Sequence, residues 1–116
     1  MRKIESEMVK AIKANRNWRD GQTSTEVVLV TDGQTEVIRI MVKFHATIIA
    51  KQLASGEWIL NSGGYHTTTT KSRINAVLDG IGSPWRLFQH NFEWALFNHK
   101  LDKSIPFVDG MTLPTE

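Results

Sequence analysis

The chain has no cysteine among its 116 residues, and this absence excludes several kinds of chemistry. Without thiols there can be no disulfide, no thiolate metal site and no cysteine nucleophile, and such a composition is typical of a reducing compartment. No apolar run approaches the roughly 18 residues of a membrane-spanning helix, so we expect no membrane association. The charged N-terminal residues lead into no apolar segment, which argues against a secretory signal.

Neither sign of charge dominates, because the formal net charge is only +2, yet the charges are unevenly distributed. A local excess of cations favours an anionic partner such as nucleic acid, although a solvated helix face is the simpler interpretation. The excess lies in residues 1–19, where Arg2, Lys3, Lys10, Lys13, Arg16 and Arg19 stand against Glu5 and Glu7.

Recognisable catalytic and metal-binding patterns are missing as well. The four histidines form no helical pair at metal-ligand spacing, and Ser62 lies in Asn-Ser-Gly-Gly rather than in a nucleophile elbow. The carboxylates are scattered singly, and no Gly-Lys-Ser/Thr order marks a nucleotide-hydrolysing loop. We therefore expect no catalytic residue, no metal and no cofactor, and we favour a noncatalytic function.

Apolar periodicity predicts the secondary structure. Helical spacing over residues 3–15 places Ile4, Met8, Ala11 and Ile12 on one face. The next segments alternate between apolar and polar residues, or are rich in β-branched ones, and therefore predict strands. These strands cover residues 25–31, 36–44, 46–53 and 57–61, with Asp32-Gly33 as a hairpin turn.

The second half of the chain predicts one more helix and one more hairpin. Residues 70–79 have helical spacing, with Thr69 or Thr70 as the N-cap and Gly80 or Gly82 as the C-terminal stop. Residues 85–89 and 92–97 predict a hairpin that turns near His90-Asn91.

These elements define the fold class that we expect. The order α-β-β-β-β-α-β-β predicts an α+β fold, in which a mostly antiparallel sheet of about five or six strands carries both helices on one face. We expect a single domain over residues 1–98, with residues 99–116 as a docked or flexible extension.

One polar segment has the composition of an anion site. Glycines at 63 and 64 precede Thr67, Thr68, Thr69 and Thr70, and Lys71 and Arg73 follow at the start of the predicted helix. Hydroxyls and free helix N–H groups bind phosphate well. Cations in a first helical turn are unfavourable unless an anion or a nearby carboxylate offsets them. Arg16 and Arg19 would widen the basic surface. In the simpler alternative, one threonine caps the helix and the cations reach solvent.

Two segments carry a resemblance to a known family. They are residues 1–12 with Asn17-Trp18-Arg19, and the run from Gly63 to Asn75 followed by Phe88-Gln89 and Phe92-Glu93-Trp94. Together they resemble small proteins of tailed bacteriophages, notably those of marine bacteria, with a core similar to glycine-aromatic-x-T-x-T-T-K-x-R-L/I-N. The resemblance spans most of residues 1–97. It implies expression in the cytoplasm of an infected bacterium, and it transfers no catalytic residue.

Two functions follow as hypotheses. The first is a noncatalytic phage accessory protein that binds nucleic-acid phosphates through Thr67–Thr70, Lys71 and Arg73, with Arg16 and Arg19 nearby. The second is a protein-binding module that modulates a host or phage enzyme through an apolar patch around Trp85 or Trp94, or through a sheet edge. A homodimer formed through a sheet edge is compatible with both.

Overall fold

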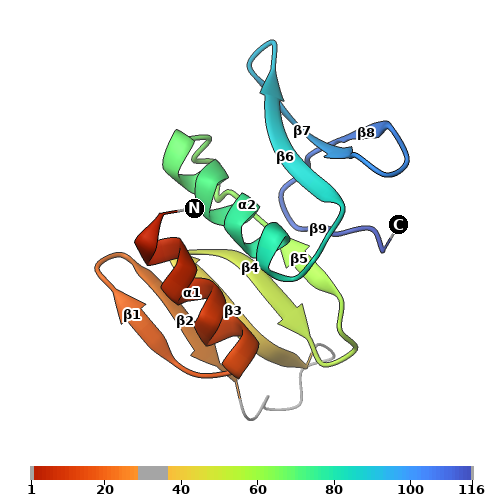
Figure 1. Cartoon of the computed structure of the whole chain (residues 1–116). Coiled ribbons are helices and arrows are strands. Elements are labelled where there is room, and N and C mark those ends of the chain that lie inside the picture. Colours follow the sequence, from red (N-terminus) through yellow and green to blue (C-terminus); the bar gives the residue numbers. More distant parts are fainter. Residues whose placement is uncertain (1, 29–36, 116) are drawn as a thin grey trace.

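The computed structural model describes residues 2–28 and 37–115, and Figure 1 shows their arrangement. The predicted Asp32-Gly33 turn lies outside the described residues. In chain order the elements are α1 (Lys3–Ala14), β1 (Trp18–Asp20), β2 (Thr23–Val27), β3 (Ile38–Phe44), β4 (Thr47–Leu53), β5 (Trp58–Leu60), α2 (Thr68–Gly80), β6 (Trp85–His90), β7 (Glu93–Asn98), β8 (Lys103–Pro106) and β9 (Met111–Thr112).

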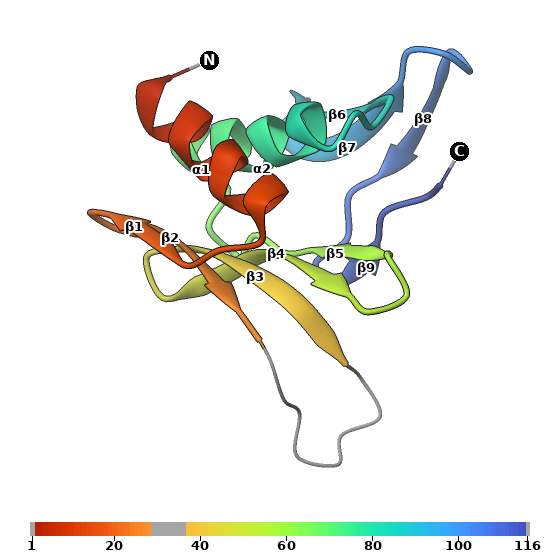
Figure 2. The same cartoon turned by 60° about the horizontal axis from the view of Figure 1, so that its bottom comes forward.

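The predicted α+β class is confirmed, and the strands form two antiparallel sheets. The larger sheet has the order β1-β2-β3-β4-β5-β9, and the smaller has the order β6-β7-β8. Both helices cover the same face of the larger sheet, as predicted (Figure 2). The helices pack closely at one point, because a Cβ atom on Gly80 would lie 2.6 Å from Cγ1 of Val9.

Helix α1 ends at Ala14, one residue before the end of the helix predicted over residues 3–15. Asn15 adopts a left-handed conformation (φ 51°), and its N–H bonds to the carbonyl of Ile12, which closes the helix. The chain that follows forms the edge strand β1. Its first residue, Trp18, is half-buried against the core.

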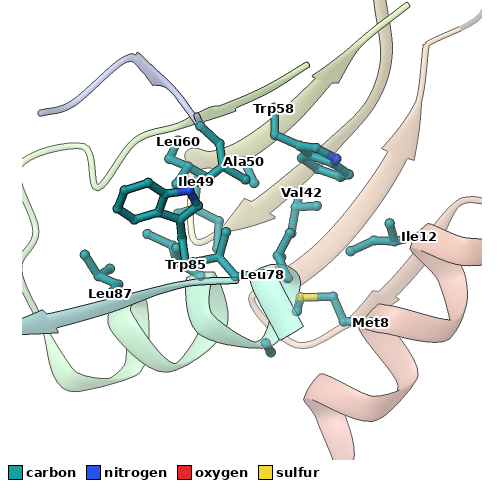
Figure 3. Close-up of a cluster of buried hydrophobic side chains, with 14 of the residues drawn as sticks. Met8, Ile12, Val42, Ile49, Ala50, Trp58, Leu60, Leu78, Trp85 and Leu87 are labelled. Carbon is teal, nitrogen blue, oxygen red and sulfur yellow. The ribbon is translucent and has the colours of Figure 1, made fainter. Parts of the chain in front are cut away.

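The core lies between the larger sheet and the two helices (Figure 3). Ile40 and Val42 of β3 are fully buried, so the predicted alternation of this strand is confirmed. Facing them are Met8 and Ile12 of α1 and Leu78 of α2. Trp85 of β6 also enters this core, with 1% of its surface exposed.

The predicted β6–β7 hairpin is present, but it belongs to the smaller sheet. Its turn is Asn91-Phe92, with both residues at positive φ (51° and 64°). The side-chain amide of Asn75 in α2 bonds to both the N–H and the carbonyl of Leu87, at 2.7 and 2.9 Å. Helix α2 therefore occupies the edge of β6 at that residue.

The C-terminal segment is docked on the fold and adds a strand to each sheet. Strand β8 pairs with β7, and β9 pairs with β5. Asp109 accepts hydrogen bonds from the N–H and hydroxyl of Ser62, at 2.7 and 2.8 Å, and Leu113 is buried. None of the helices in the described part of the chain is long and apolar enough to cross a membrane.

Candidate functional site

The start of α2 is organised by a different threonine from those predicted. Thr67, not Thr69 or Thr70, is the N-cap, because it has extended backbone angles and its hydroxyl accepts the N–H of Thr70 at 3.1 Å. The two hydroxyls of Thr67 and Thr70 also lie 2.9 Å apart. Within the described residues, the N–H groups and hydroxyls of Thr68 and Thr69 make no hydrogen bond to the protein. They are therefore free to meet a ligand.

The loop before α2 is held rigidly on both sides. On one side, Gly63 (φ 66°) lies so close to β4 that a Cβ atom there would be 2.7 Å from Cγ2 of Thr47. On the other side, the ring of His66 stacks on Trp94, with centroids 4.3 Å apart. Ser62 links the loop to the C-terminal segment through Asp109. These contacts position the threonines without a ligand.

A cavity of about 640 Å³ lies between this loop, the start of α2 and the β3–β4 turn. Its walls combine aromatic rings with hydroxyl groups, and no carboxylate of residues 2–28 or 37–115 lines it. Tyr65 is 66% exposed, so its ring remains available for a ligand. The lining residues are Phe44, His45, Ala46, Thr47, Ile49, Ser62, Tyr65, Thr67, Thr69 and Thr70.

The two cations predicted at this site have different roles. Arg73 is only 6% exposed, and its guanidinium lies 2.6 Å from the carboxylate of Glu5 in α1. Its Nε also donates to the hydroxyl of Thr23 at 3.1 Å. Arg73 is thus internal, and the Glu5 carboxylate offsets its unfavourable place near the helix start. Lys71 is half-buried, and no carboxylate in the described residues forms an ion pair with it.

Arg16 and Arg19 do not join the threonines. Arg16 follows the C-terminal end of α1, whereas Glu5 near its N-terminal end contacts α2, and about 14 Å of helix axis separate Glu5 from that end. Arg19 follows Trp18, which packs against the core, so strand alternation turns Arg19 to the face of the sheet opposite the helices. Both arginines are exposed.

The residues that sequence reasoning missed come from the β3–β4 turn. His45 occupies a left-handed conformation (φ 56°), and its ring lies 4.4 Å from that of Phe44. No glycine or asparagine marks this turn, so the only available signal was the short gap between two predicted strands.

The exposed aromatic side chains are also not those expected. Trp85 and Trp94 are 1% and 4% exposed, so neither forms a surface patch. Instead, Phe92 at the tip of the β6–β7 hairpin is 92% exposed. In the described ranges, 2–28 and 37–115, no group of three His, Asp or Glu side chains is arranged to hold a metal ion.

Comparison with known proteins gives one match. The family model described as "Kyanoviridae Gp96 protein" matches residues 1–114, nearly the whole chain. No curated protein and no solved structure matches it. The resemblance to tailed-phage proteins is therefore confirmed. The chain belongs to the Kyanoviridae Gp96 family of tailed-phage proteins.

Proposed function

We propose that this phage protein is a noncatalytic nucleic-acid-binding protein that acts in the cytoplasm of the infected cell. Its site would be the cavity at the start of α2, which receives one nucleotide of a single strand. The observation that carries this proposal is the pair of unpaired N–H groups at Thr68 and Thr69 beside an aromatic-walled cavity. Free N–H groups at a helix start bind phosphate, and aromatic rings stack on bases.

The electrostatics around the cavity support an anionic ligand. Helix α2 has 13 residues and directs its positive dipole end at the threonines. Lys71 adds one cation, whereas the charge of Arg73 is already neutralised by Glu5. With so few charges the affinity should be modest and largely independent of sequence, because phosphate contacts carry no sequence information.

The shape of the cavity favours a single strand over a duplex. Its volume of about 640 Å³ is typical of small-ligand sites and accommodates a nucleobase that has left its stack. Tyr65 and His45 offer ring faces for that base. Paired bases inside a duplex could not enter a cavity of this kind.

The test is a fluorescence-anisotropy titration of labelled single-stranded DNA, single-stranded RNA and duplex DNA over a salt series. We expect the single strands to bind more tightly. Lys71→Ala should weaken binding and lower the salt slope by about 0.7, the contribution of one phosphate contact to a single strand. Tyr65→Ala should remove a stacking contact worth about 1–3 kcal/mol without changing that slope.

The controls separate this site from general charge effects. Lys13→Ala removes an exposed cation near the far end of α1 and should leave binding unchanged. Thr69→Val keeps the shape of the side chain but removes its hydroxyl, and it should weaken binding. Equal effects of Lys71→Ala and Lys13→Ala, or unchanged binding in Tyr65→Ala, would refute the proposed site.

A further inference from the structure

One face of the smaller sheet has an apolar centre and is turned away from the hydrophobic core of the described chain. In β6 and β7 the buried residues Trp85, Leu87, Trp94 and Leu96 alternate with residues that point the other way. The register places these outward residues side by side across the three strands. We call this side of the sheet the outer face. Its apolar members are Phe88, Ala95, Phe97 and Pro106, and its polar members are Arg86, His90, Glu93 and Ser104.

The two phenylalanines of the outer face do not belong to the core. Partly buried apolar side chains that pack against the core include Ile105 and Phe107, but neither Phe88 nor Phe97. Pro106 is exposed, and Ala95 is half-buried in the central strand of the sheet. The outer face therefore has an apolar centre that is separate from the hydrophobic core, with Phe88 and Phe97 half-buried and Pro106 exposed.

Phe92 extends this surface in an unusual way. A two-residue turn with positive φ at both positions strongly prefers glycine as its second residue. Here that residue is Phe92, which adopts φ 64° and exposes 92% of its surface. A bulky side chain in this conformation is strained, and the ring gains almost no contact within the chain. The ring is therefore available to a partner.

We propose that the outer face is the interface of a symmetric dimer, with a second copy of this chain as its occupant. The centre of the face is uncharged and its rim is charged, which is the anatomy of a protein–protein interface. A nucleic acid would instead require several unpaired cations on the face, whereas Arg86, the cation that the register places there, is already ion-paired with Asp79. Sheet edges are poor alternatives, because Asn75 covers the edge of β6 and β8 has only four residues and ends in Pro106.

Charge favours an antiparallel packing of the two faces. On the outer face, the hairpin tip carries the carboxylate of Glu93, and the hairpin base carries the guanidinium of Arg86, which is also ion-paired with Asp79. A two-fold axis through the sheet brings the tip of each copy to the base of the other, so Glu93 of each copy meets Arg86 of the other.

The size of the face predicts a weak dimer. A six-residue hairpin is about 20 Å long and three strands span about 14 Å, so the flat face covers about 280 Å². The two copies together would bury about 560 Å² of this face, and even with side-chain relief and Phe92 added the total falls below that of a standard interface of roughly 1,200 Å² or more. We therefore expect a dimer whose population depends on concentration.

Sedimentation equilibrium of the whole chain over a wide concentration range tests this proposal. The wild type should show a reversible monomer–dimer equilibrium. The combined change Phe88→Thr/Phe97→Thr keeps good strand formers, and it should raise the Kd about tenfold or more for each ring removed. Phe92→Gly supplies the residue that the turn prefers, so it should weaken the dimer while the melting temperature holds or rises.

A matched control and a cross-linking experiment complete the test. Val108→Thr changes a residue that is 60% exposed but lies off the outer face, and it should leave the Kd unchanged. Because the chain has no cysteine, Ala95→Cys introduces a single thiol near the axis. Stacked sheets lie about 10 Å apart, so a bismaleimide of that span should link two copies. Lys13→Cys should give only background linkage.

Three results would overturn the proposal. They are a monomer at every concentration, a dimer that persists unchanged in both Phe88→Thr/Phe97→Thr and Phe92→Gly, and equal cross-linking of Ala95→Cys and Lys13→Cys. None of these measurements involves nucleic acid, so the dimer and the proposed nucleic-acid site can fail independently.

Discussion

The buried pair of Glu5 and Arg73 provides the most demanding prediction from this structure. The two side chains are 4% and 8% exposed, and the Glu5 carboxylate accepts from Arg73 Nη1 and from the Ser72 hydroxyl, both at 2.6 Å. The guanidinium also lies over the ring of Phe44, 5.5 Å from its centroid. The pair therefore joins α1 to α2 and, through Thr23, to the sheet.

The expected magnitude follows from the cost of a buried charge that loses its partner. Glu5→Leu would leave the buried guanidinium without its partner, and Arg73→Met would leave the buried carboxylate without its partner. Each change should lower the free energy of unfolding by about 3–5 kcal/mol. A domain of this size has about 6–17 kcal/mol of total stability, so either change removes a large part of it. Replacing both partners together should be close to neutral, because the desolvation cost of the two charges disappears as well.

The assay is urea denaturation of the wild type, both single variants and the double variant. Trp85 and Trp94 are buried, so their fluorescence reports unfolding. We expect a coupling free energy of several kcal/mol, with the double variant more stable than either single variant. Single variants that lose less than about 1 kcal/mol would show that solvent screens the pair. Losses that simply add in the double variant would show that the two residues act independently.

Two further predictions concern close packing and the C-terminal segment. Gly80→Ala should destabilise the wild type by up to about 3 kcal/mol, because the added methyl group overlaps Val9. In a Val9→Ala background the same change should stabilise the protein by about 1 kcal/mol, because alanine has the higher helix propensity. Thermal melts of the four proteins test whether the sign of the effect reverses. Asp109→Ala should lower the free energy of unfolding by about 1–3 kcal/mol, because it leaves the N–H and hydroxyl of the buried Ser62 without their acceptor. Asp109→Asn keeps an acceptor oxygen, so its free energy of unfolding should fall much less. Urea denaturation of both variants measures the difference. The first explanation would be contradicted if Gly80→Ala changed the melting temperature equally with valine and with alanine at position 9. The second would be contradicted if both Asp109 variants lost the same free energy of unfolding.

Much of the candidate site was visible in the sequence because its residues are contiguous. The threonines and Lys71 lie together at a helix start in the structure, as their spacing predicted. Arg73 looks like another surface cation in the sequence, and only the position of α1 shows that Glu5 neutralises it. The N-cap was misplaced by two or three residues because any of several adjacent threonines could cap the helix, and only backbone geometry distinguishes Thr67.

Local periodicity in the sequence determined the two helices, the α+β class and the β6–β7 hairpin, because these features depend on residues a few positions apart. The tertiary structure alone decided how the strands divide between two sheets. That division depends on contacts between distant residues, such as those of Asn75 with Leu87 and of Asp109 with Ser62. The same holds for the cavity beside Tyr65 and for the burial of Trp85 and Trp94. The sequence alone does not show whether an aromatic or basic residue is buried or exposed. Only the packing between remote segments decides this.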